Sequence, residues 1–295
     1  MFEPFDLSYG YNFVYYHLEN MPFLYTIIAF TLLMVEAILL NNILAEYKIT
    51  PKTSYMTAFL YILLMSSTPL MLTLHPFLIS NGFIILLLTM LLRIKTKEES
   101  YKEIFICGLF AGISSLFYFK SAGLILIVWI FLLIFHTFSW REWIISVIGL
   151  ATVYIYLFTY FLLSDQLSMV VYQYRNVFNV FNLGRYSLSF SVFQYITSAI
   201  IGMLLLVSFT KMFVISREKI IYVRKVFNVI FWLFLLNSLS MLFLITNFIY
   251  EFSYLLLPIT ILTSYYYLSL KKVLFGEIMM WLLITSIVLQ KIFIA

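Results

Sequence analysis

The sequence predicts an all-α integral membrane protein, a polytopic bundle of about ten transmembrane helices that forms a single domain over residues 1–295. Hydrophobic residues make up 64 % of the chain and charged residues 11 %, whereas soluble domains average roughly 45–50 % and 25 %. Apolar runs of about twenty residues recur along the chain, the length that a helix needs to cross a bilayer. Barrel strands would instead give runs of about ten residues with alternating polarity.

The apolar runs define the expected helices. They cover about 22–45, 54–74, 77–93, 104–119, 122–138, 143–164, 191–212, 226–247, 253–270 and 273–294. Pro69 breaks the second run, and Pro76 is typical of a first helical turn. Only Lys120-Ser121 and residues 139–142 separate the three central runs, so we expect these helices to lie antiparallel and side by side.

Two polar segments accompany the apolar runs. Residues 1–20 are acidic and aromatic and hold no Lys or Arg, unlike a signal peptide. Residues 166–190 form the longest polar connection, and Asn residues interleave with aromatic and aliphatic ones at 176–182, which favours a short helix lying on the membrane surface. We expect both segments to be extracytoplasmic.

The basic residues predict the orientation in the membrane. With ten helices, one side carries Lys48, Lys52, Arg93, Lys95, Lys97, Lys102, Arg141, Lys211, Arg217, Lys219, Arg224, Lys225, Lys271 and Lys272, and the other only Lys120, Arg175, Arg185 and Lys291. The positive-inside rule makes the first side cytoplasmic in a bacterial inner membrane. Both termini and Lys120 then face outward. A further helix upstream of residue 1 would account for the acidic start equally well.

Composition also excludes several classes of function. No polar stretch exceeds about 25 residues, too few for a nucleotide-binding domain. The net charge of +5 comes from loop residues, so we expect no nucleic-acid partner. Cys107 is the single cysteine and the three histidines are scattered, which predicts neither a disulfide within the chain nor a metal site. No cofactor is expected, and the lipid bilayer is the expected surrounding.

The outward side holds the only mixed set of acidic and basic side chains. A carboxylate such as Asp6 or Glu19 could activate a sugar hydroxyl as a general base. Lys120, Arg175 and Arg185 could hold a lipid phosphate. The alternative is that outer loops of any membrane protein carry about this many polar residues, and the lack of a paired acidic motif favours that interpretation.

Two features inside the apolar runs also suggest roles. Glu36 lies near the middle of the first run, where an ionised, unpartnered carboxylate costs roughly 2.5–3.5 kcal/mol. It is either a proton-relay or intersubunit site, or a structural carboxyl that is protonated or hydrogen-bonded, for example to Asn41 or Asn42. Gly108 and Gly112 lie four residues apart and give one helix face a small-residue seam for close packing of another backbone.

Two segments resemble known families. GLFAGISSLFYFKSAGLILIVWIFLLIF, residues 108–135, followed by a short basic turn and another apolar run, resembles the helical core of integral-membrane glycosyltransferases that use polyprenyl-phosphate sugar donors, the GT-C superfamily. This resemblance implies a GT-C-like fold, a polyprenyl-phosphate lipid as partner, a catalytic acid at Asp6 or Glu19, and Lys120 near the donor phosphate. SWREWIISVIGLATVYIYLFTYFLLSDQ, residues 139–166, resembles an uncharacterised family of multi-spanning inner-membrane proteins from Bacteroidetes-type bacteria, which implies no particular activity.

Three functions are compatible with these patterns. The leading hypothesis is a non-enzymatic subunit of a cell-envelope assembly with other membrane proteins as partners, because the chain offers intramembrane contact surfaces and few catalytic side chains. The first alternative is a GT-C-like glycosyltransferase or polymerase at the outer face. The second is a transporter or lipid flippase that uses Glu36 as its coupling carboxylate. It ranks last because the break at Pro69 has no counterpart in the second half.

Overall fold

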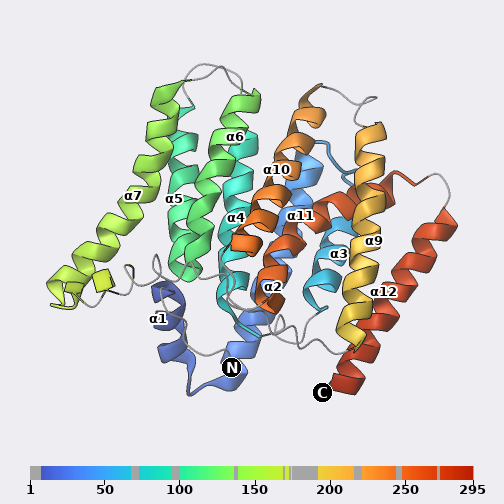
Figure 1. The fold of residues 1–295 in the computed structure, drawn as a ribbon, viewed down its shortest axis with the longest axis horizontal. Helices are drawn as coiled ribbons and strands as arrows, with labels where there is room; N and C mark the ends of the chain where they lie inside the picture. Colours follow the sequence, from blue (N-terminus) through green and yellow to red (C-terminus); the bar gives the residue numbers. More distant parts are fainter. Residues whose placement is uncertain are drawn as a thin grey trace.

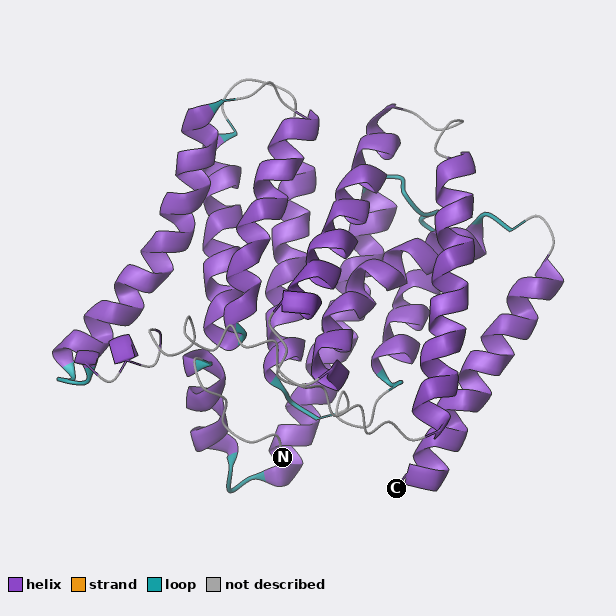
Figure 2. Ribbon diagram, viewed as in Figure 1, coloured by secondary structure: helices purple, strands orange, loops and turns teal. Residues whose placement is uncertain are grey.

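Helices joined by mostly short connections make up the fold (Figure 1). The computed structural model describes residues 8–67, 73–94, 100–135, 139–168, 170–172, 174, 192–215, 221–243, 248–270 and 273–294, and every regular element among them is helical (Figure 2). The elements are α1 (Tyr9–Leu18), α2 (Pro22–Glu46), α3 (Met56–Met65), α4 (Pro76–Arg93), α5 (Tyr101–Phe117), the 3₁₀ helix η2 (Phe119–Leu124), α6 (Ile125–Phe135), α7 (Trp140–Leu163), α9 (Val192–Ile215), α10 (Ile221–Phe243), α11 (Phe248–Leu268) and α12 (Val273–Ile294).

Six of these helices are long and apolar enough to cross a membrane, namely α2, α4, α7, α9, α10 and α12. Their outward faces are apolar, and Phe23, Tyr156, Leu274 and Phe293 are each about two-thirds or more exposed. Such faces are stable against lipid tails, so the chain is a multi-pass membrane protein. The prediction of about ten spans exceeds the six that the described residues support.

The shorter apolar helices explain this difference. Three stretches, Met56–Met65, Phe119–Phe135 and Tyr254–Leu268, fall below the length of the six candidate spans, and the fourth expected span corresponds to α5, which has 17 residues. The ten residues of α3 rise only about 15 Å, half of a hydrocarbon core of about 30 Å. The predicted 54–74 helix corresponds to α3, which ends at Met65, and its break at Pro69 lies outside the described residues.

Local sequence explains where several helices begin. His75 precedes α4 in an extended conformation, and its Nδ1 accepts a hydrogen bond from the Leu78 N–H at 3.1 Å, so the side chain caps the helix while Pro76 fills its first position. Tyr118 is also extended and separates α5 from η2. The predicted surface helix at 176–182 lies outside the described residues, whereas α1 forms within the acidic and aromatic segment, where no helix was predicted.

The small-residue face of α5 packs against α7 of the same chain. A Cβ on Gly108 would collide with the carbonyl oxygen of Ser146, and a Cβ on Gly149 would collide with that of Phe105. A Cβ on Gly112 would lie 2.8 Å from Val153 Cγ2. The backbones of α5 and α7 therefore touch, as small-residue seams in membranes allow, and this face offers no surface to a second protein.

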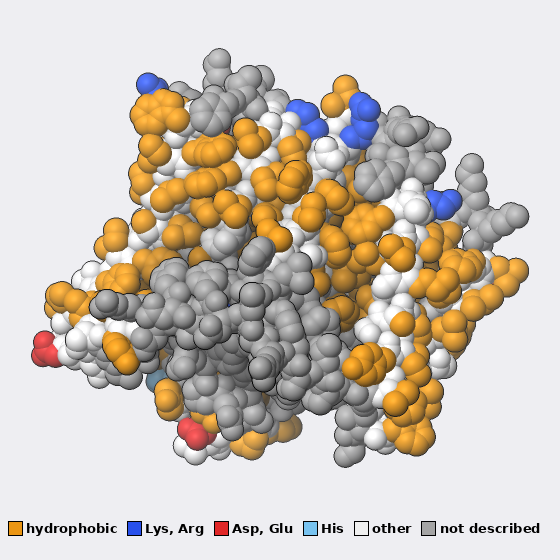
Figure 3. Space-filling view, in the orientation of Figure 1, with side chains coloured by type: hydrophobic (Ala, Val, Ile, Leu, Met, Phe, Trp, Pro, Cys, Tyr) orange, Lys and Arg blue, Asp and Glu red, His pale blue; other side chains and the backbone are white. Residues whose placement is uncertain are grey.

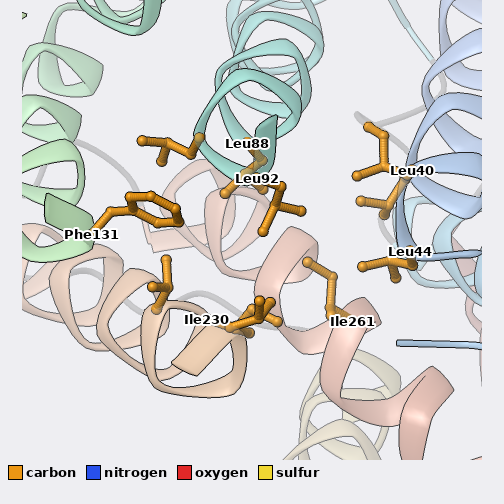
Figure 4. Close-up of a pocket in the computed structure, with 11 residues that line it drawn as sticks. Leu40, Leu44, Leu88, Leu92, Phe131, Ile230 and Ile261 are labelled. Atoms are coloured by element: carbon orange, nitrogen blue, oxygen red, sulfur yellow. The ribbon is translucent and has the colours of Figure 1, made fainter. Parts of the chain in front are cut away.

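The other helices pack around two shared neighbours. α5 lies between α4 and α7, while α11 contacts α3, α9 and α10, and α12 packs on α9. Where α2, α4, α6, α10 and α11 meet, apolar side chains such as Leu40, Leu88, Phe131, Ile230 and Ile261 surround a cavity of about 20 Å³ (Figure 4). A cavity with no polar partner for water stays dry, so this region is packed core.

Most of the described basic side chains lie at one end of the helices, whereas Lys120 and Lys291 lie at the other. Arg93 ends α4 and Arg141 lies in the first turn of α7, at one end, and Asp165 follows α7 at the other. Figure 3 shows basic side chains along the upper rim and acidic ones at the lower rim, with an apolar surface between them. This distribution is typical of a protein whose helices cross a bilayer.

Candidate functional site

Lys120 lies at a cavity between η2, α6, α10 and α11. The cavity has a volume of about 170 Å³ and is lined by Lys120, Gly123, Leu124, Leu126, Leu236, Asn237, Leu239, Ser240 and Tyr254. Lys120 reaches this place because Tyr118 ends α5 in extended conformation and η2 then turns the chain into α6. We call this feature the Lys120 cavity.

The polar groups of the Lys120 cavity are held in place by contacts within and between the helices that carry them. The Asn237 amide nitrogen donates a hydrogen bond to the Tyr254 carbonyl at 3.3 Å, which ties α10 to α11. The Ser240 hydroxyl donates to the Asn237 carbonyl at 2.8 Å. The Lys120 ammonium lies 5.8 Å from the centre of the Tyr118 ring, a cation–π arrangement, and that ring packs at 5.3 Å from the ring of Tyr254. One cation and several dipoles thus belong to the lining of the cavity.

Aliphatic side chains also line the Lys120 cavity. Leu126 on α6 and Leu239 on α10 are 42 % and 47 % exposed on the outer surface of the bundle. Because these two residues belong both to the cavity and to the lipid-facing surface, the cavity adjoins the region of lipid tails. A ligand with a polar head and an apolar tail matches this lining.

The other residues predicted for an outer site are only partly placed. Asp6, Arg175 and Arg185 lie outside the described residues. Glu19 is exposed just after α1, at the same end of the bundle as Lys120. The structure therefore brings no second predicted charge into the Lys120 cavity among the residues that it describes.

A buried polar cluster near the start of α4 was not predicted. The Tyr11 and Tyr25 hydroxyls lie 2.7 Å apart, and the Tyr25 hydroxyl donates to the carbonyl oxygen of Leu74. His75 follows directly and is 1 % exposed, and its Nε2 has no hydrogen-bond partner among the described residues. Burial lowers the pKa of His75 to about 3, so the ring is neutral at physiological pH. This cluster fixes α1 and α2 against the beginning of α4.

Glu36 is buried where α2 packs against α3 and α4. The Tyr61 hydroxyl of α3 donates a hydrogen bond to Glu36 Oε2 at 2.7 Å. Glu36 Oε1 faces Gly82 of α4, where a Cβ would lie 2.9 Å away. Oε1 and both amide atoms of the neighbouring Asn81 have no hydrogen-bond partner among the described residues. The sequence pointed to Asn41 or Asn42 as the partner of Glu36, but the partner in the structure is Tyr61.

Sequence reasoning missed most of the residues around these two sites. Lys120 was predicted from the sequence, but Asn237 and Ser240 were not, although they interrupt the apolar run at 226–247. Tyr61 gives no comparable signal, because a tyrosine in an apolar helix is common at membrane interfaces. Its role depends on how α3 packs on α2.

No group of three or more His, Cys, Asp or Glu side chains converges on a possible metal position within the part of the chain that the structure describes. Comparisons with protein-family models, with curated proteins and with solved structures find no match to this chain. The two resemblances noted in the sequence therefore stay predictions, and function is argued from the geometry of the sites.

Proposed function

We propose that the chain is a non-enzymatic membrane component of a bacterial cell-envelope assembly, and that it binds the phosphate of a polyprenyl-phosphate-type lipid in the Lys120 cavity. The observation that carries this proposal is a cation and several polar groups in a cavity that is also lined by Leu126 and Leu239, which are exposed on the outer surface of the bundle. A lysine is a common binder of phosphate groups in proteins. The resemblance at residues 108–135 points to the same lipid class.

The size of the cavity supports a head group as the part that binds. Cavities that enclose a whole drug-sized ligand measure roughly 300–1,000 Å³, whereas the Lys120 cavity measures about 170 Å³. A phosphate with its first few substituents fits this volume. The hydrocarbon chain would leave between Leu126 and Leu239 into the bilayer.

The lining supports binding without catalysis. Among the described residues that line the cavity there is no Asp, Glu or His. General acid–base chemistry at neutral pH needs such a group within hydrogen-bond reach of the substrate. We therefore assign the cavity to holding a lipid-linked intermediate for other envelope proteins.

The charge distribution supports an outward position for this ligand. Lys120 belongs to η2, which joins the end of α5 to the start of α6, opposite to the ends where α4 finishes and α7 begins. If the basic end is cytoplasmic, as the positive-inside rule favours, both termini are extracytoplasmic and the cavity serves the outer leaflet of the inner membrane.

Lipid-dependent thermal stability tests this function. The purified chain in detergent is heated with undecaprenyl phosphate, with undecaprenol, or with neither. We expect only the phosphate to raise the melting temperature, and Lys120→Gln to remove this rise. Lys291→Gln, which removes a basic residue at the same end of the bundle, should preserve it. An equal rise in the wild type and in Lys120→Gln would reject the Lys120 cavity as the phosphate site.

The exposed carboxylate of Glu19 provides a test of the alternative that the chain is an enzyme. It lies at the same end as Lys120 and would be the acid that a GT-C-like glycosyltransferase requires. In cells, Glu19→Gln and Asp6→Asn should leave surface glycans unchanged if the chain is a binding subunit, and affinity purification should recover stoichiometric partners. Loss of a glycan in either variant, with normal protein levels, would favour the enzyme.

A further inference from the structure

Three helices bring uncharged and acidic oxygen atoms together inside the bundle, away from the Lys120 cavity. Glu36 on α2 is 1 % exposed, Tyr61 on α3 is fully buried, and so is Asn81 on α4. The Tyr61 hydroxyl donates to Glu36 Oε2, and the Asn81 side chain lies close enough to that hydroxyl to act on it, while Asn81 Oδ1 has no hydrogen-bond partner among the described residues. Glu36 Oε1 and Asn81 Oδ1 are therefore available to a further group.

The depth of Glu36 in the bundle makes an ionised carboxylate unfavourable in free energy unless a ligand compensates its charge. Glu36 lies ten residues before Glu46, the last residue of α2, and at 1.5 Å per residue this is about 15 Å from the helix end. This depth is close to the middle of a hydrocarbon core of about 30 Å. An ionised carboxylate there needs a compensating charge.

The described neighbours supply no such charge. Among them, the groups that act on the Glu36 carboxyl are the Tyr61 hydroxyl from α3 and the backbone of Gly82 from α4. α1, which also packs on α2, contributes no charged side chain to it. Gly82 has no side chain, so Oε1 lies against the backbone of α4 at that position and meets no charged group from it.

We propose that Glu36, Tyr61 and Asn81 form a site for one small monovalent cation, a proton or Na⁺. Oxygen atoms are the ligands of hard cations, and a single carboxylate balances a single positive charge. A divalent ion would need more carboxylates and six to eight oxygen ligands, according to the general pattern for Ca²⁺. The proposal goes beyond the proposed function and shares no residue with the Lys120 cavity, so either site can fail alone.

Cation-dependent stability of the full chain tests this site. In one arm, NaCl replaces choline chloride at constant ionic strength and pH 8. In the other, the pH falls from 8 to 5 without Na⁺. A ligand that binds only the folded state raises its stability with concentration, so each tenfold rise in the cation above its dissociation constant should raise the melting temperature by roughly 2–3 °C. A response to NaCl identifies sodium, and a response confined to the pH arm identifies the proton.

Variants separate this response from other titrations. Glu36→Gln keeps a hydrogen-bond acceptor for Tyr61 and should lose the cation response. Because His75 also responds to acid, the pH arm is evaluated as the difference in melting temperature between wild type and this variant. Glu19→Gln removes an exposed carboxylate and should keep the response. Asn81→Leu should shift the rise in melting temperature to a higher cation concentration.

Infrared difference spectroscopy of the wild-type chain gives a second measurement if Glu36→Gln does not fold. The carboxyl band of Glu36 should change with Na⁺ or with pH. Equal melting temperatures of wild type and Glu36→Gln across both arms, or a carboxyl band that neither cation changes, would overturn the proposal and leave Glu36 as a structural hydrogen-bond acceptor.

Discussion

Gly82 on α4 faces Glu36 on α2 so closely that a Cβ at position 82 would lie 2.9 Å from the carboxylate Oε1. The carboxylate could turn away from a new methyl group, but Tyr61 holds its other oxygen. The close contact therefore couples a helix-interior glycine to a hydrogen bond between two other helices. In a helix interior, glycine is less favourable than alanine by about 1 kcal/mol. The close contact with Glu36 is a physical reason why glycine occupies position 82.

The first prediction is that Gly82→Ala destabilises the chain by about 1 kcal/mol, because leaving the buried Tyr61 hydroxyl without its acceptor costs roughly 1–3 kcal/mol and alanine recovers about 1 kcal/mol of helix propensity. In a Tyr61→Phe background the carboxylate is free to move, and the same substitution should become neutral or stabilising. Unfolding in mixed micelles with increasing SDS measures both differences. Identical effects in the two backgrounds would show that Tyr61 does not hold the carboxylate in place.

The second prediction concerns the contact between α5 and α7. A Cβ on Gly108 meets the backbone carbonyl of Ser146, which cannot rotate away, so Gly108→Ala should cost about 1–3 kcal/mol as overpacking does. Gly202 in α9 has open space around it, with no atom within 4 Å of the position that a Cβ would take. Gly202→Ala should therefore be neutral or stabilising by up to about 1 kcal/mol. The same SDS titration compares the two, and equal effects would contradict the close backbone contact.

The general architecture could be predicted because hydrophobicity alone encodes it. Long apolar runs identify α2, α4, α7, α9, α10 and α12 without any knowledge of packing. The count of about ten spans went beyond this signal, since runs such as 54–74 contain a helix of only ten residues in the structure. Run length measures apolar character and not where a helix ends.

The sites were harder to predict because they depend on contacts between distant residues. Lys120 stood out as an isolated cation at a turn, but its neighbours Asn237 and Tyr254 come from α10 and α11. Glu36 stood out as a carboxylate in an apolar run, yet its partner Tyr61 lies 25 positions away on another helix. Sequence patterns show which side chains need a partner, and helix packing decides which partner they find.

The third prediction is an acid sensitivity centred on His75. The neutral ring caps α4 through Nδ1, and burial lowers the pKa of His75 to about 3. In the unfolded chain its pKa is about 6.5, so the folded state binds the proton more weakly. Stability from this residue is complete above about pH 6.5 and is lost as the pH falls, by up to about 1.4 kcal/mol per unit.

Melting temperatures between pH 8 and pH 5 measure this effect. His75→Asn keeps a capping side chain that does not titrate and should flatten the acid limb of the curve. His17→Asn, at an exposed position at the end of α1, is the matched control, and this variant should keep the acid limb that His75 produces. A wild-type curve that His75→Asn does not alter would exclude His75 as the source of acid sensitivity.

The fourth prediction fixes which end of the bundle faces outward. Lys52 and Asn20 are both exposed and lie in connections at opposite ends of α2, and the native Cys107 is fully buried and should not react. In intact spheroplasts, a membrane-impermeant maleimide should label Asn20→Cys, whereas Lys52→Cys should react only after the membrane is opened. This outcome places the Lys120 cavity beside the outer leaflet, where a lipid carrying an exported sugar would be found. The reverse pattern would place the cavity beside the inner leaflet, and its lipid phosphate would then have to be bound before export.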